Sequence, residues 1–163
     1  MEIMQIFGLQ FLLSTIGVAL IARWYFAPRL AELPTNRALQ LLLLPHMFRH
    51  LGLVFVVPGL VGPNLDPSFA AGAAYGDLAS GLLAIVAAVM LQARTRGAIA
   101  VVWLFNIIGS VDLVNALRQA EVVPDLGVAW LIPTFVVPVL LVTHFMIFVR
   151  LVKQRRFVTL EAQ

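Results

Sequence analysis

The stretch LLLLPHMFRHLGLVFVVPGL, residues 41–60, decides how this chain folds. It is apolar almost throughout, yet His46, Arg49 and His50 lie near its middle. About 20 apolar residues are the length of a helix that crosses the hydrocarbon core of a bilayer. If residues 41–60 form such a helix, other parts of the protein must compensate the arginine and the two imidazoles, because charge at that depth is costly.

The composition of the whole chain indicates a membrane protein. Of 163 residues, 61% are hydrophobic and 12% are charged, which is more apolar surface than a soluble domain of this length can bury. We therefore expect one transmembrane domain, residues 1–163, integral to the lipid bilayer of a bacterial inner membrane. The chain has no cysteine, which excludes disulfides and thiolate metal sites. Its basic residues occur in short clusters between apolar runs, so we expect membrane topology, and no nucleic-acid partner, to explain them.

Five apolar runs are long enough to cross a bilayer. The predicted fold class is therefore all-α, a polytopic bundle of five transmembrane helices. We expect these helices over about residues 4–26, 38–60, 69–93, 98–117 and 126–149. The chain turns between the second and third helices, because the loop VGPNLDPS contains two prolines that cannot continue a helix.

The basic residues alternate between the two ends of the predicted helices. They gather around the first connection, in the third connection and in the tail 150–163, whereas the second connection has none. Lysine and arginine favour the cytoplasmic side of a membrane. We therefore expect the N-terminus outside and the C-terminus, with its basic tail, in the cytoplasm. The start MEIMQ is acidic where a cleavable signal peptide would be basic, so the first helix is expected to be retained.

Residues 46–50 predict a polar face on the second helix. At 100° per residue, His46, Arg49 and His50 fall within about 100° of arc. Such a face should point into the bundle, because an unpaired arginine in the membrane costs at least about 2.5 kcal/mol. We therefore expect one inward stripe of three side chains.

Partners for this stripe are expected on the third, fourth and fifth helices. Asp112 and Asp77 are the candidate carboxylates, and we favour Asp112 because its helix carries further polar residues, including Asn106. His144 is expected at about the same depth as His46. The third helix has a different pattern, a small-residue ridge that lets a neighbouring helix approach closely. The ridge residues are Gly72, Gly76, Ser80 and Ala84.

These observations favour binding or translocation of a small polar or anionic solute, linked to protons. The cavity lining that we predict consists of His46, Arg49, His50, Asn106, Asp112 and His144. Arg49 would attract an anionic or polar group, and the histidines would exchange protons near neutral pH. A chain of this size would then form a homo-oligomer, although the lack of an internal repeat, which many transporters show, counts against a transporter.

Two other classes of function stay open. In one, the protein is a membrane redox protein: His46 and His144 could hold haem iron, the set His46, His50 and His144 could bind a divalent metal, and Arg49 could contact a haem propionate or a quinone. In the other, it is a non-catalytic accessory subunit that contacts a membrane-protein partner through its small-residue ridge. No phosphate-binding loop or soluble hydrolase motif is present, and the sequence leaves undetermined whether the protein is an enzyme.

Overall fold

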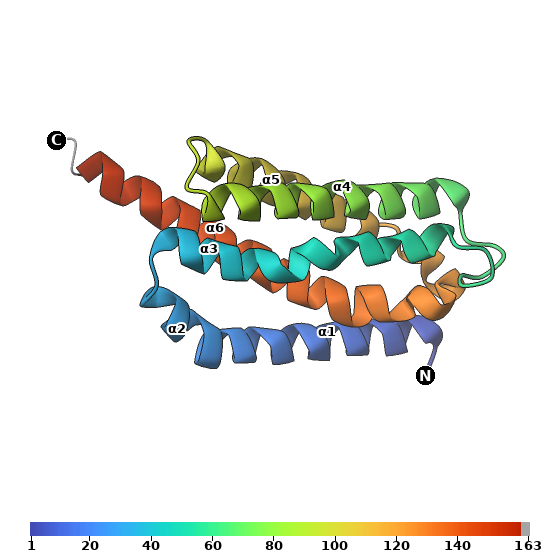
Figure 1. The fold of residues 1–163 in the computed structure, drawn as a ribbon. Coiled ribbons are helices and arrows are strands. Elements are labelled where there is room, and N and C mark those ends of the chain that lie inside the picture. Colours follow the sequence, from blue (N-terminus) through green and yellow to red (C-terminus); the bar gives the residue numbers. More distant parts are fainter. Residues whose placement is uncertain (161–163) are drawn as a thin grey trace.

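The computed structural model describes residues 1–160, and the side chains of residues 1–154. The described chain is all-helical and contains no strand (Figure 1). Among the described residues, five helices are long and apolar enough to cross a membrane. They are Ile3–Ala31, Thr35–Val56, Pro67–Gln92, Ala98–Leu117 and Gly127–Gln154. The number of helices agrees with the sequence prediction, and the ends of the helices differ from it by a few residues.

Three of these five helices combine segments of different geometry. In chain order the elements are α1 (Ile3–Ile21), the π-helical turn η1 (Ala22–Phe26), α2 (Ala27–Ala31), α3 (Thr35–Leu43), the 3-10 helix η2 (Leu44–Val56), α4 (Pro67–Gln92), α5 (Ala98–Leu117), the 3-10 turns η3 (Ala120–Asp125) and η4 (Gly127–Trp130), the π-helical turn η5 (Ile132–Val136) and α6 (Val137–Leu160). Both π-helical turns end two residues before a proline, Pro28 or Pro138. Proline has no N–H to donate to the preceding turn. The N–H of the residue that precedes each proline, Ala27 or Val137, donates to the carbonyl oxygen five positions earlier, not four as in an α-helix.

The 3-10 geometry of η2 determines which side chains of the second helix face inward. Its buried residues are His46, Arg49, Gly52 and Phe55, each three positions after the last. A 3-10 helix has three residues per turn, so residues i and i+3 lie one above the other. His50 is one position further round, about 120° away, and it is exposed. The expected inward stripe of three is therefore wrong for His50, because that expectation assumed α-helical geometry.

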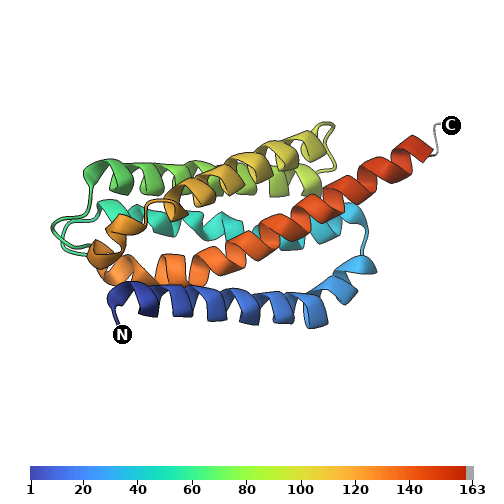
Figure 2. The same cartoon turned by 180° about the vertical axis from the view of Figure 1, so that it is seen from behind.

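The first helix lies at the edge of the bundle. α1 has no buried residue, and it contacts mainly α6, η5 and η3. In both views α6 crosses the bundle obliquely between α1 and the layer formed by α4 and α5 (Figures 1 and 2). The N-terminus and the loops 57–66 and 118–126 lie at one end of the bundle, here called the N-terminal end. The end of α6 and the loops 32–34 and 93–97 lie at the other, the C-terminal end.

The loop before α4 ends in a helix cap. The carboxylate of Asp66 accepts hydrogen bonds from the backbone N–H groups of Ser68, at 2.8 Å, and Phe69, at 2.9 Å, and Pro67 occupies the first helical position. This is the usual arrangement at a helix start. The hydrogen bonds from the Ser68 side chain and the Phe69 backbone hold the pKa of Asp66 below its usual value. The predicted break at Pro67 is thus the start of the third membrane-length helix.

An apolar layer fills the bundle on its C-terminal side. Its fully buried side chains come from α3, α4, α5 and α6 and include Leu39, Leu43, Leu91, Phe105, Ile147 and Leu151. Of the small-residue ridge, Ser80 and Ala84 are fully buried, whereas a Cβ added at Gly72 would meet nothing within 4 Å. α6 continues through residues 150–160 of the predicted tail, and residues 161–163 of that tail lie outside the described residues.

Candidate functional site

Arg49 lies between two carboxylates in the interior of the bundle. Its Nε donates to Oδ1 of Asp77 at 2.7 Å, and its Nη2 donates to Oδ2 of Asp112. Its Nη1 donates to the carbonyl oxygen of Gly109 at 3.2 Å. The arginine side chain is fully buried, whereas the Asp77 and Asp112 side chains are 12% and 21% exposed. We call Arg49, Asp77 and Asp112 the ion cluster.

Two glycines make room for the carboxylates of the ion cluster. A Cβ added at Gly52 would overlap the carboxylate of Asp77, and one added at Gly76 would overlap that of Asp112. Any larger residue at either position would push a charged group out of place. Gly76 was predicted as part of the small-residue ridge, and its close neighbour is a side chain that belongs to the site.

A pair of imidazoles lies beside the ion cluster. The ring centroids of His46 and His144 are 4.2 Å apart, and the ring of Phe105 lies against both, at 5.0 and 5.2 Å. Both histidines are buried. Gly109 separates this imidazole pair from the arginine: a Cβ added there would lie 2.8 Å from Nη1 of Arg49 and 2.9 Å from Nε2 of His144.

Hydrogen bonds determine which nitrogen of each ring carries the proton. Asn106 donates from Nδ2 to the carbonyl oxygen of His144 at 3.2 Å, so its Oδ1 accepts from Nδ1 of His144 at 2.7 Å. The hydroxyl of Thr143 donates to the Val139 carbonyl oxygen and lies 2.9 Å from Nε2 of His46, which therefore donates to it. Nε2 of His144 and Nδ1 of His46 are buried without a hydrogen-bond partner among the described residues. Each neutral ring thus keeps one free proton acceptor.

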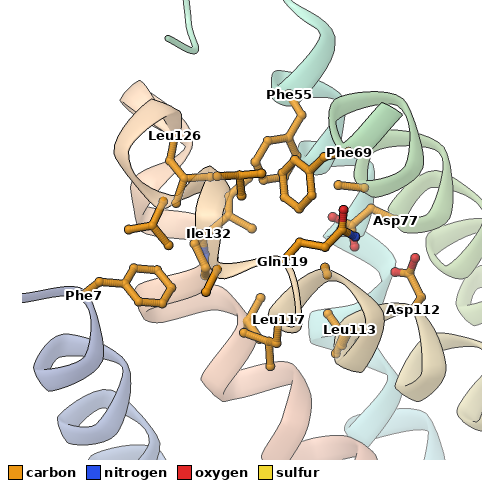
Figure 3. Close-up of a pocket in the computed structure, with 17 residues that line it drawn as sticks. Phe7, Phe55, Phe69, Asp77, Asp112, Leu113, Leu117, Gln119, Leu126 and Ile132 are labelled. Carbon is orange, nitrogen blue, oxygen red and sulfur yellow. The ribbon is translucent and has the colours of Figure 1, made fainter. Parts of the chain in front are cut away.

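A cavity of about 60 Å³ lies next to the ion cluster, toward the N-terminal end (Figure 3). Asp77 and Asp112 are the charged residues that line it. The rest of its lining is largely apolar and includes Phe7, Phe55, Phe69, Leu113, Leu126 and Ile132. A buried water needs about 10 to 15 Å³ of such space, so this cavity is large enough for a few water molecules or one very small solute.

The structure brings together most of the predicted site residues and separates one from the rest. Those that lie together are His46, Arg49, Asn106, Asp112 and His144. His50 is exposed, and its Nδ1 lies 3.2 Å from the carbonyl oxygen of Met47. Gly52, Gly109 and Thr143 were not predicted. Gly52 and Gly109 each lie on a helix that carries an intramembrane charge, but only the placed side chains of Asp77, Arg49 and His144 show that glycine is needed there.

The observed arrangement does not fit a haem or a three-histidine metal site. The rings of His46 and His144 are in contact, so there is no space between them for a macrocycle. With His50 outside, only two imidazoles meet, and the described residues contain no group of three metal-binding side chains. All three nitrogens of Arg49 are bonded to protein oxygens, so the side chain is already held by Asp77, Asp112 and the Gly109 carbonyl.

Fold and site together define the class of protein: an all-helical chain with five membrane-length helices and a charged cluster in its interior. Residues 6–152 match the family described as "Domain of unknown function (DUF8737)", and the chain belongs to that family. The matched stretch contains every residue of the ion cluster and of the imidazole pair. No curated protein and no solved structure matches the chain.

Proposed function

We propose that this protein is an integral membrane protein whose ion cluster binds a proton, and that this binding is coupled to the binding or translocation of a small polar solute. One observation carries the proposal: a single buried arginine lies between two carboxylates. Arg49 can balance one negative charge. The second carboxylate needs a proton or a cation to become neutral, because an unbalanced charge is costly inside a membrane.

The imidazole pair supports a proton function for the same site. His144 and His46 each keep one buried ring nitrogen that accepts no hydrogen bond from the described residues, and Gly109 places the free nitrogen of His144 beside Arg49. The site therefore gathers two carboxylates and two imidazoles around one guanidinium, from η2, α4, α5 and α6. Chains of such groups are the usual proton relays of membrane proteins.

The charge balance of the site favours a neutral or cationic solute over an anionic one. Arg49 is bonded through all of its nitrogens, and the cavity presents carboxylates. An anion there would meet Asp77 and Asp112 before it met the arginine. We therefore propose water, a protonated amine or another small polar group as the class of solute that accompanies the proton.

The distribution of basic residues supports one orientation of the bundle. The C-terminal end carries Arg23, Arg29, Arg37, Arg94, Arg96, Arg150 and Lys153. By the positive-inside rule this end would face the cytoplasm, and the cavity beside the ion cluster would open toward the outside. The apolar layer on the C-terminal side would then close the path to the cytoplasm, so translocation requires a second conformation.

The test is proton uptake by the purified protein in liposomes that contain a pH-sensitive dye. We expect an imposed pH gradient to drive proton flux in the wild type, and the variant Asp77→Asn/Asp112→Asn to abolish it. Glu32→Gln, which removes an exposed carboxylate at the opposite, C-terminal end of the bundle, should leave the flux unchanged.

Infrared spectroscopy of the same variants separates proton binding from proton transport. If the wild type shows no flux, it should still show the carbonyl band of a buried protonated carboxyl group, and the double variant should lack that band. Absence of both flux and band in the wild type would refute the proposal.

A further inference from the structure

A larger hollow of about 690 Å³ lies between the first membrane-length helix and α6, away from the ion cluster. It extends toward the C-terminal end, where α6 runs obliquely away from α1 and α2 (Figure 2). Its walls are largely apolar and include Ala19, Ala27, Leu30, Leu42, Phe145 and Val149. We call it the α1–α6 groove.

The charges in this groove all have one sign. Arg23, Arg150 and Lys153 line it, and no aspartate or glutamate does. Nη2 of Arg150 donates to the carbonyl oxygen of Leu33, whereas its Nε is buried without a hydrogen-bond partner among the described residues. Three cations at the end of an apolar channel are therefore available for an anionic group.

We propose that the α1–α6 groove binds a phospholipid with an anionic headgroup. Its phosphate would lie among Arg23, Arg150 and Lys153, and an acyl chain would cover the apolar walls. A basic pocket between membrane helices on the cytoplasmic side is the typical site for such a lipid. The edge position of α1 fits this occupant. α1 has no buried residue, so it does not pack closely over the whole of α6, and the apolar surface of α6 in the groove stays open to an acyl chain.

Other ligands would match either the cations of the groove or its apolar walls, but not both. A free anion such as phosphate would use the three cations and leave the apolar walls bare. A second copy of this chain would need acidic side chains opposite the cations. Among the described residues, Glu32 is the one acidic side chain at the C-terminal end of the bundle. An anionic phospholipid matches both the charge and the walls.

The experiment is lipid binding by the full-length protein, measured by native mass spectrometry with phosphatidylglycerol and phosphatidylcholine of equal acyl length. We expect phosphatidylglycerol to be retained and phosphatidylcholine to be lost. Each basic residue near an anionic surface contributes about 1 kcal/mol, so the variant Arg23→Gln/Lys153→Gln should bind phosphatidylglycerol about 30-fold more weakly. The control Arg94→Gln/Arg96→Gln removes the same charge from an exposed loop at the same end and should bind like the wild type.

Three results would overturn the proposal. Equal retention of the two lipids would show that the cations do not select the headgroup. Equal weakening by the groove variant and the loop variant would show that net charge, not the groove, attracts the lipid. If glycerol phosphate alone raised the thermal unfolding temperature of the wild type as much as phosphatidylglycerol does, the groove would bind a soluble anion. None of these results bears on proton binding at the ion cluster, so the two proposals can fail separately.

Discussion

The charge balance of the ion cluster can be tested by a cycle of two substitutions, Asp77→Asn and Asp112→Asn. Each single variant leaves Arg49 with one ionised partner, and the new amide oxygen can still accept a hydrogen bond. We expect each single substitution to lower the free energy of unfolding by about 1 to 2 kcal/mol, the usual effect of weakening one charged hydrogen bond. The double variant differs in kind, because it leaves the fully buried guanidinium without any counter-ion.

Removing the last partner of a buried charge costs about 3 to 5 kcal/mol in total. The second substitution alone costs about 1 to 2 kcal/mol, so the double variant should be destabilised by at least about 1 kcal/mol more than the sum of the two singles. Adding Arg49→Met to the double variant removes the charge altogether. The triple variant should recover most of that extra loss, since an apolar replacement of a buried ion group is often neutral or stabilising.

The measurement is unfolding of the purified variants in detergent at pH 7, followed by the circular dichroism of the helices. The sum of the single effects is the reference. If the double variant loses no more than that sum, the two carboxylates act independently and Arg49 is not balanced by them. If the triple variant is less stable than the double, the loss arises from packing, and the electrostatic reasoning is wrong.

Three further predictions concern Gly109, the histidines and the cap of α4. Gly109→Ala should lower the free energy of unfolding by about 1 to 3 kcal/mol, because the new methyl group overpacks the site. Gly72→Ala, whose methyl group meets nothing within 4 Å, should change it little. Equal effects of the two substitutions on thermal unfolding would contradict the packing at Gly109. His144→Gln should slow proton flux in liposomes and His50→Gln should not, because His50 is exposed; flux that depends on His50 instead would rule out the proposed relay. The cap at Asp66 stabilises the start of α4 above the unfolded pKa of about 3.8, and this stability is lost as the pH falls through the lower folded pKa. The protection factors of the backbone amides in the first turn of α4, which correct exchange rates for their intrinsic pH dependence, should therefore fall on acidification. In the Asp66→Ala variant they should be low without this fall.

Hydropathy was sufficient to predict the five helices, because membrane length and apolar composition leave few alternatives. The inward position of Arg49 followed from the cost of its charge, which any membrane-spanning arrangement must meet. The sequence did not show that Arg49 bonds both Asp77 and Asp112. A guanidinium has several N–H donors in a fork, so one arginine can bond two carboxylates, and the sequence argument had assumed a single pair.

The position of His50 could not be predicted from periodicity, because the period itself was unknown. Long 3-10 segments are uncommon, and an α-helical period was the reasonable assumption for residues 44–56. Pro45 marks the point where the geometry changes, but a proline at such a position is also compatible with a simple kink. The glycines at 52 and 109 were missed for a related reason: the need for glycine appears only when the charged neighbours are placed.

The geometry of η2 and the ion cluster depend on each other, which gives the proposed function a physical route. Conversion of η2 to an α-helix would turn Arg49 by about 60° relative to His46, and would shorten the 13-residue segment by about 6 Å. Arg49 could not then keep both carboxylates while His46 stayed beside His144. The bonds from Arg49 to Asp77 and Asp112 therefore favour the less common helix form. A proton on either carboxylate weakens one of those bonds and so lowers the preference for the 3-10 form. Proton binding at this site would thus act on the segment that carries the site, which is the coupling that translocation requires.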